Sequence, residues 1–205
     1  MQTTYLFFVI LISLGQLLFV HSNDRYKFTS PNLAQQWQSS YLLVATDNYQ
    51  KYDYAKGYIY ADFINFGFNV TYQWGNAEAN TILLNPDIEN NILNGYNWVN
   101  AIKSCVLYGP FDLTEMKNDF RWEIPANATQ LECNNNVCAW QFYSNEINYN
   151  TTMFVNVKNG GVQRMELINY HSFWFPQYSN ITFQFNDPNV GPFDKSVYDK
   201  PAFCH

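Results

Sequence analysis

Apolar and polar residues alternate along two segments of this chain, and the alternation constrains the fold more than any other feature. In the segment 64–72 the even positions are apolar and mostly aromatic, whereas the odd positions are Asn, Gly or Thr. In the segment 181–185, Ile and Phe alternate with Thr and Gln. Successive side chains of a β-strand point to opposite faces, so each segment predicts a strand with one apolar and one polar face.

Several other segments also favour strands. The runs 153–157 and 162–168 flank Asn159-Gly160, a strong short hairpin signal, because both turn residues have to accept a positive φ. Shorter β-rich runs predict strands at 41–46, 81–84, 103–107, 137–143 and 171–175. The sequence therefore predicts a mainly β protein, with an antiparallel sheet of about nine to eleven strands.

Helix signals are few and short. Ser30-Pro31 is a good N-cap and first-turn pair, which predicts a short helix through Trp37. Single helical turns are expected over 86–93 and 113–118. Helices are thus expected to be minor additions to the sheet.

The N-terminal segment predicts a secretory signal. Residues 5–20 are almost wholly apolar and no charged residue precedes Asp24, but the run is shorter than a membrane span. We place cleavage after Ser22, which leaves residues 23–205 as a single domain with no transmembrane segment. Four Asn-x-Ser/Thr sequons, of which at least two are expected to be used, support the secretory route: Asn69, Asn127, Asn150 and Asn180.

The four cysteines predict two disulfides in an oxidising compartment, with three pairings open. Cys133 and Cys138 flank an Asn-rich turn that a local bridge could close. Cys105 and Cys204 would then tie the C-terminal tail to the middle of the fold.

Composition and charge exclude some function classes. The formal net charge is −6, which argues against a nucleic-acid partner, because such a protein needs clustered Lys and Arg. The chain holds 17 Phe, 16 Tyr and 6 Trp, more aromatic residues than one domain interior readily absorbs, so some are expected to line a pocket or a partner surface.

No catalytic constellation stands out. His171 lies in an aromatic strand and is interpreted as a structural histidine, while Asp47, Asp53 and Asp62 are interpreted as solvated turn acids. The loop 187–194 offers oxygen ligands for calcium but lacks the EF-hand spacing, so calcium is a minor hypothesis. We expect no catalysis, no cofactor and no resident metal.

Short motifs in the C-terminal half resemble ependymin-related proteins, secreted glycoproteins of the LolA/ependymin superfamily. These motifs, which fall within residues 100–205, are Ile102-Lys103-Ser104-Cys105, residues 124–129, Asn186-Asp187-Pro188 and residues 197–204. The resemblance implies a strongly curved antiparallel sheet, a half-barrel with an apolar pocket and no known catalysis. It also implies a Cys105–Cys204 bridge, a glycan on Asn127, an extracellular or lysosomal location, and a homodimer as a further expectation.

The leading hypothesis is a secreted, non-catalytic glycoprotein that binds an apolar, lipid-like ligand in an aromatic-lined concave sheet. A carbohydrate-binding or matrix adhesion protein with exposed Trp and Tyr is the alternative, and an extracellular hydrolase is the third. An enclosed apolar pocket favours the first hypothesis, and a flat exposed aromatic row beside polar groups favours the second. The expected pocket lining is Phe66, Phe68, Val70, Tyr72, Trp140, Phe142, Val155, Phe183 and Phe185.

Overall fold

The structure is a computed structural model that describes residues 31–47, 49, 51–119, 122–144, 149–169 and 178–205. The predicted signal segment, His171 and the predicted strand 171–175 lie outside the described residues.

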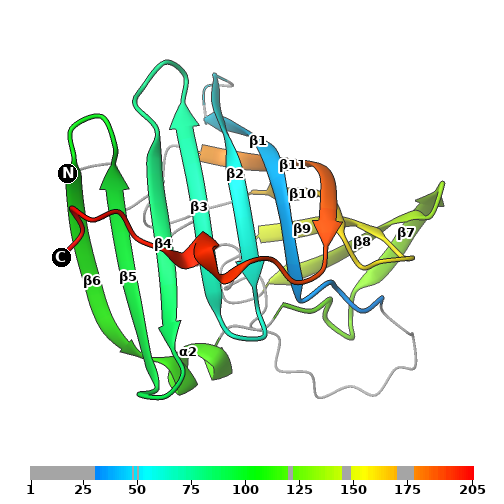
Figure 1. Cartoon of the computed structure of the whole chain (residues 1–205). Helices are drawn as coiled ribbons and strands as arrows, with labels where there is room; N and C mark the ends of the chain where they lie inside the picture. Colours follow the sequence, from blue (N-terminus) through cyan, green and yellow to red (C-terminus); the bar gives the residue numbers. More distant parts are fainter. Residues whose placement is uncertain (1–30, 48, 50, 120–121, 145–148, 170–177) are drawn as a thin grey trace.

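Within the described residues, eleven strands form one antiparallel sheet in the order β6-β5-β4-β3-β2-β1-β11-β10-β9-β8-β7, with β6 and β7 at its edges (Figure 1). The predicted mainly β, antiparallel fold is confirmed. The strands are β1 (Gln36–Asp47), β2 (Tyr52–Asp62), β3 (Gly67–Trp74), β4 (Asn80–Asp87), β5 (Ile92–Val99), β6 (Ser104–Asp112), β7 (Thr129–Asn134), β8 (Val137–Ser144), β9 (Tyr149–Asn156), β10 (Val162–Ile168) and β11 (Tyr178–Val190).

The two halves of the chain meet at the centre of the sheet, where β1 pairs with both β2 and β11. In Figure 1 strands β2–β6 run upright and β7–β9 run across them, so the sheet is strongly twisted and curved. Two short helices complete the described fold: α2 (Leu113–Asp119), which follows β6, and the 3₁₀ helix η1 (Lys195–Tyr198).

The predicted alternation is confirmed in β3. Phe68, Val70 and Tyr72 are at most 1% exposed and belong to the main core, while Asn69 and Thr71 lie on the opposite face at half-buried positions. We call the face that carries the main core the inner face and the opposite one the outer face.

The chain beyond β11, residues 191–205, crosses the outer face from β11 towards β6, and we call it the C-terminal strap (Figure 1). Its Tyr198 hydroxyl donates to the Gly67 carbonyl at 3.3 Å. The strap helps to form a second core with Leu83, Trp98 and Cys204 at its centre. This core explains why β4 is buried on both faces, since Leu83 points away from Ile82 and Leu84.

Both predicted disulfides are confirmed. Cys105 of β6 is joined to Cys204 of the strap, 99 residues further along the chain. Cys133 and Cys138 form the second bridge, across the β7–β8 hairpin.

The helix prediction was right only for 113–118, which form α2. Residues 31–35 are not helical, and Trp37 belongs to β1, where it pairs with Ala61 and Val190. Tertiary pairing overrides the capping signal here, because strand geometry lets the Trp37 ring enter the main core. Residues 86–93 are likewise a strand end, a turn at 88–91 and the start of β5.

Two further predictions need correction, one about a turn and one about where a strand begins. In the β9–β10 hairpin only Gly160 has a positive φ, because the turn spans more than the predicted two residues. The strand predicted from residue 64 begins at Gly67, and Phe66 sits in the preceding turn with a φ of 65°.

Candidate ligand-binding site

The structure brings all nine predicted lining residues into one buried cluster, and each of them is at most 5% exposed. They come from β3, β8, β9, β11 and the turn before β3, so segments far apart in the sequence converge on the inner face. The predicted residues therefore form part of one packed apolar core on the inner face.

The rings on this face pack against one another. Phe183 and Phe185 are stacked with their centroids 6.2 Å apart, and the Tyr41 ring lies 6.3 Å from each. A small pocket of about 170 Å³ lies elsewhere, near the β9–β10 turn, and none of the nine residues lines it. Its lining is mostly polar: Asn156, Asn159, Gly161, Gln163, Asp187 and Pro188.

An aromatic corner ends the inner face beside the β2–β3 turn. Trp37 and Trp122 lie with their ring centroids 6.0 Å apart, Trp122 stacks on Phe63 at 4.7 Å, and Trp37 meets Phe185 edge-on at 5.1 Å. We call these four residues the indole corner. Sequence reasoning placed Trp37 in a helix and missed Trp122 and Phe63. The available sequence signal for Trp37 was the apolar residues at every second position of the segment 37–45, interrupted only by Ser39.

Some side-chain polar atoms are buried without a hydrogen-bond partner among the described residues. The indole nitrogens of Trp37, Trp122 and Trp140 are inaccessible to solvent and have no hydrogen-bond partner among the described residues. The Thr151 hydroxyl is in the same situation. Buried donors usually have acceptors, so these atoms mark positions where an acceptor would be stabilising.

Burial also sets the ionisation of the inner face. Desolvation raises the pKa of Tyr41 and that of Tyr72 well above the usual range. A neighbouring tyrosine raises each pKa further: Tyr72 acts on Tyr41, and Tyr108 acts on Tyr72. The Tyr41 hydroxyl donates to the Thr71 carbonyl at 3.2 Å. Both phenols therefore stay protonated and uncharged at neutral pH.

The three predicted turn acids all accept hydrogen bonds, and for Asp47 and Asp62 these bonds are local. Asp47 accepts from the backbone N–H groups of Tyr49 and Lys51 at 2.8 and 2.7 Å. Asp62 closes the β2–β3 turn in the same way, but it is 3% exposed, so the interpretation as a solvated acid was wrong for this residue. Asp53 is exposed and accepts from the Tyr178 hydroxyl at 2.6 Å.

In the predicted calcium loop, Asp194 caps a helix. The Asp194 carboxylate caps η1 by accepting from the Ser196 N–H at 2.8 Å, and this bond lowers the pKa of Asp194. Within the described ranges, no three His, Cys, Asp or Glu side chains gather as metal ligands would.

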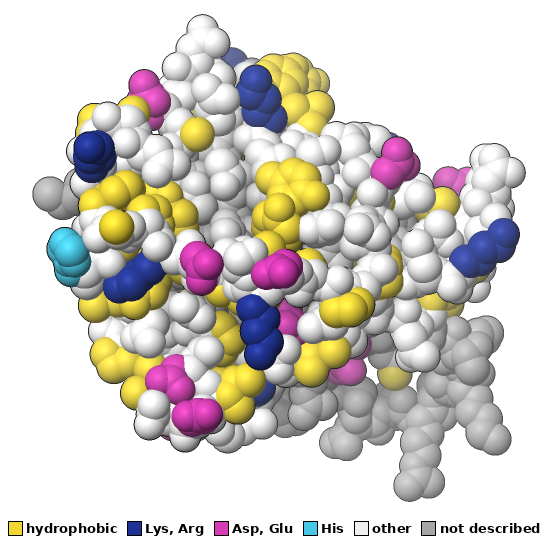
Figure 2. Space-filling view, in the orientation of Figure 1, with side chains coloured by type: hydrophobic (Ala, Val, Ile, Leu, Met, Phe, Trp, Pro, Cys, Tyr) yellow, Lys and Arg dark blue, Asp and Glu magenta, His cyan; other side chains and the backbone are white. Residues whose placement is uncertain are grey.

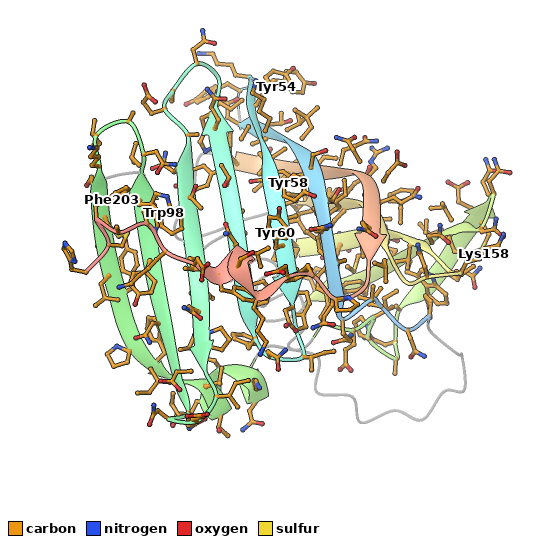
Figure 3. The ribbon with its side chains drawn as sticks, viewed as in Figure 1. Tyr54, Tyr58, Tyr60, Trp98, Lys158 and Phe203 are labelled. Atoms are coloured by element: carbon orange, nitrogen blue, oxygen red, sulfur yellow. A yellow bond between two sulfur atoms is a disulfide. The ribbon has the colours of Figure 1, made fainter. Side chains whose placement is uncertain are left out.

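The outer face of β2 carries a tyrosine row, which we define as Tyr52, Tyr54, Tyr58 and Tyr60. Figure 3 labels the last three of them. The first three are 59%, 52% and 37% exposed. The Tyr52 and Tyr54 rings are near parallel with centroids 6.4 Å apart, and those of Tyr58 and Tyr60 are 4.9 Å apart. Figure 2 shows hydrophobic side chains on this face in separate patches, with acidic and basic side chains scattered among them.

The four sequons differ in exposure. Asn127 is exposed, and Asn150 and Asn180 are half-buried. Asn69 lies on the polar face of β3, as expected, but the strap covers that face, and the Asn69 amide nitrogen donates to the Val197 carbonyl at 2.6 Å. That nitrogen is the atom to which an N-linked glycan would be attached, so Asn69 is not the open position that the sequence suggested.

Comparisons with known proteins give a limited result. No family model matches the chain, and no curated protein matches it, so ependymin membership remains a resemblance of the quoted motifs. Among solved structures 30 chains match. One is a LolA superfamily protein from Nitrosomonas europaea, with a TM-score of 0.38 and 8% identity over 83% of this chain and 92% of that chain. No helix in the described part is long and apolar enough to cross a membrane.

Proposed function

We propose that this protein is a secreted, non-catalytic glycoprotein that binds an apolar, lipid-like ligand against the inner face of its sheet. One observation supports the proposal most strongly: the nine lining residues expected from the sequence lie together in one buried apolar cluster on the inner face. Binding there would use dispersion and the removal of apolar surface from water, at about 25 cal/mol per Å². Such contacts discriminate weakly between acyl chains, so we expect a range of chains to bind.

The proposal is tested by adding one hydroxyl to each face of the sheet. Val70→Thr keeps the side-chain shape but places a hydroxyl on the inner face, where Val70 is fully buried. Val70 is shielded from water even without a ligand, so the cost of the added hydroxyl, about 1–3 kcal/mol, falls first on folding stability. A ligand that packs against this face would also meet the hydroxyl, so affinity for a fluorescent acyl probe should fall as well. The measurement is a fluorescence titration of the purified protein.

Val44→Thr is the matched control, because Val44 is a half-buried residue on the outer side of β1. It should bind the probe as the unaltered protein does. Equal affinities for the Val70→Thr and Val44→Thr proteins, with both folded by circular dichroism, would place the ligand away from the inner face.

Two features support the secretory part of the proposal. Both disulfides lie within the described residues, and disulfides persist in oxidising compartments such as the extracellular space or an endomembrane lumen. Asn127 is an exposed sequon residue, which makes it the most accessible of the four for a glycan.

The tyrosine row favours a second candidate function, the binding of carbohydrate. Aromatic rings on a flat surface can stack on sugar rings, and polar residues border this row: Tyr58 pairs with Ser40 on one side and with Thr71 on the other. The carbohydrate hypothesis expects a flat exposed aromatic row beside polar groups. Tyr52, Tyr54 and Tyr58 are exposed, whereas the strap residue Phe193 packs edge-on against Tyr60 at 5.5 Å.

If the row binds a polysaccharide, Tyr54→Ala combined with Tyr58→Ala should reduce retention on that immobilised polysaccharide at least tenfold, because exposed Tyr anchors commonly contribute more than 1 kcal/mol each. Tyr49→Ala is the control, since Tyr49 is 85% exposed but lies outside β2. A panel in which the double variant and the control bind every polysaccharide equally would remove this candidate.

A further inference from the structure

We infer that the apolar ligand carries an uncharged hydrogen-bond acceptor, such as an ester carbonyl, and that the indole N–H groups of Trp37 and Trp122 bind it. The inference rests on the proposed function, because it specifies the ligand chemistry of the same face. It adds a polar contact to a surface that otherwise offers apolar contacts.

The two indoles are held in fixed positions. Trp37 lies in the central strand β1, paired on both sides. Trp122 is fixed through its backbone, since the Gln35 side-chain amide donates to the Trp122 carbonyl at 3.0 Å and to the Leu33 carbonyl at 3.1 Å. The two ring centroids are 6.0 Å apart, so both donors belong to the indole corner.

Both donors lack an acceptor in the described structure. Trp37 is 1% and Trp122 is 3% exposed, and neither indole nitrogen has a hydrogen-bond partner among the described residues. A buried donor without a partner is unfavourable, so a ligand oxygen that reached these nitrogens would recover a full hydrogen bond. Tryptophan can only donate, which makes an acceptor the complementary group.

The indole corner lies close to the surface. Phe63, which stacks on Trp122, is only half-buried, and it follows directly after the end of β2. A ligand could therefore place its polar end at the corner and its chain along the inner face. A ligand of this shape resembles an acyl ester or a long-chain alcohol.

The charges of the site favour a neutral acceptor over a carboxylate. Among the described residues, Asp62 is the one charged side chain that is buried, and no described Lys, Arg or His is. A carboxylate at the corner would lose its hydration without gaining a buried cation from the described residues, which is strongly unfavourable. We therefore expect discrimination against fatty-acid anions.

The test compares three probes of equal chain length at pH 8: the methyl ester, the fatty acid and the alkane, each measured by displacement of a fluorescent apolar probe. The methyl ester should bind about tenfold more tightly than the alkane and than the fatty-acid anion. Trp37→Phe and Trp122→Phe, made separately, keep an aromatic ring but remove the donor. Each should lower ester affinity towards that of the alkane and leave alkane affinity unchanged.

Trp98→Phe is the control, because Trp98 belongs to the second core on the outer face. Thermal unfolding checks that each variant is folded, and the comparison of the three probes on the unaltered protein needs no variant. Fatty acid binding as tightly as the ester, or ester affinity unchanged in both indole variants, would overturn the inference and leave the proposed function standing. If none of the probes binds, the proposed function itself fails.

Discussion

Replacing Cys105 and Cys204 together with serine should lower the thermal unfolding midpoint by roughly 10–20 °C. The bridge joins residues that are 99 apart in sequence, and in the chain-entropy model a loop of about that length stabilises the fold by about 4.7 kcal/mol. For a domain of this size each kcal/mol corresponds to about 2–4 °C. The measurement is calorimetry or circular dichroism during heating, under non-reducing conditions.

The variant should also release the strap, because Cys204 is part of the second core. Trp98 is 5% exposed in the intact protein and should become accessible to acrylamide quenching. The matched control is Cys133→Ser with Cys138→Ser, which opens a loop between residues 5 apart and should cost about 2 kcal/mol. A larger loss of stability in the control than in the Cys105 and Cys204 variant would contradict this account of the strap.

Gly57→Ala should destabilise the protein by about 3 kcal/mol or more, because the site cannot accept a methyl group. A Cβ at Gly57 would lie 1.8 Å from the Thr71 carbonyl oxygen and 2.9 Å from the Tyr41 hydroxyl. The first contact is with backbone of the neighbouring strand, so β2 and β3 would have to move apart. Urea unfolding measures the loss.

Gly95→Ala is the control for this prediction, since Gly95 is also inside a strand. Its nearest contact would be the flexible end of Leu84 at 3.2 Å, so we expect a loss of about 1 kcal/mol or less. If Gly57→Ala unfolds at the same urea concentration as Gly95→Ala, the close approach of β2 and β3 is not as described.

The alternating segments could be predicted because local pattern and tertiary environment agree there. In β3 every second side chain faces the main core, and nothing interrupts the alternation between Gly67 and Tyr72. Strand β2 was missed because Lys56 and Gly57 interrupt its apolar pattern. The close fit of Gly57 against Tyr41 and Thr71 is a relation between three strands, which no single segment reveals.

The core residues of the inner face were predicted more completely than their surroundings. Periodicity identifies residues on one face, so Phe183 and Phe185 could be assigned together. The indole corner needs Trp122 to reach back to Trp37 across 85 positions of sequence, and only the folded chain shows that contact. The strap posed the same problem, since a polar residue such as Asn69 gives no sign that another segment will cover it.

Native mass spectrometry of the secreted protein tests the central claim most directly. After enzymatic removal of glycans, the account predicts a mass above that of the disulfide-bonded polypeptide, and organic extraction should remove the excess. The extracted molecule should be an uncharged lipid with an acceptor oxygen. A protein whose mass equals that of the polypeptide before and after extraction, and which still takes up no methyl ester, alkane or fatty acid when these are added, would contradict the account.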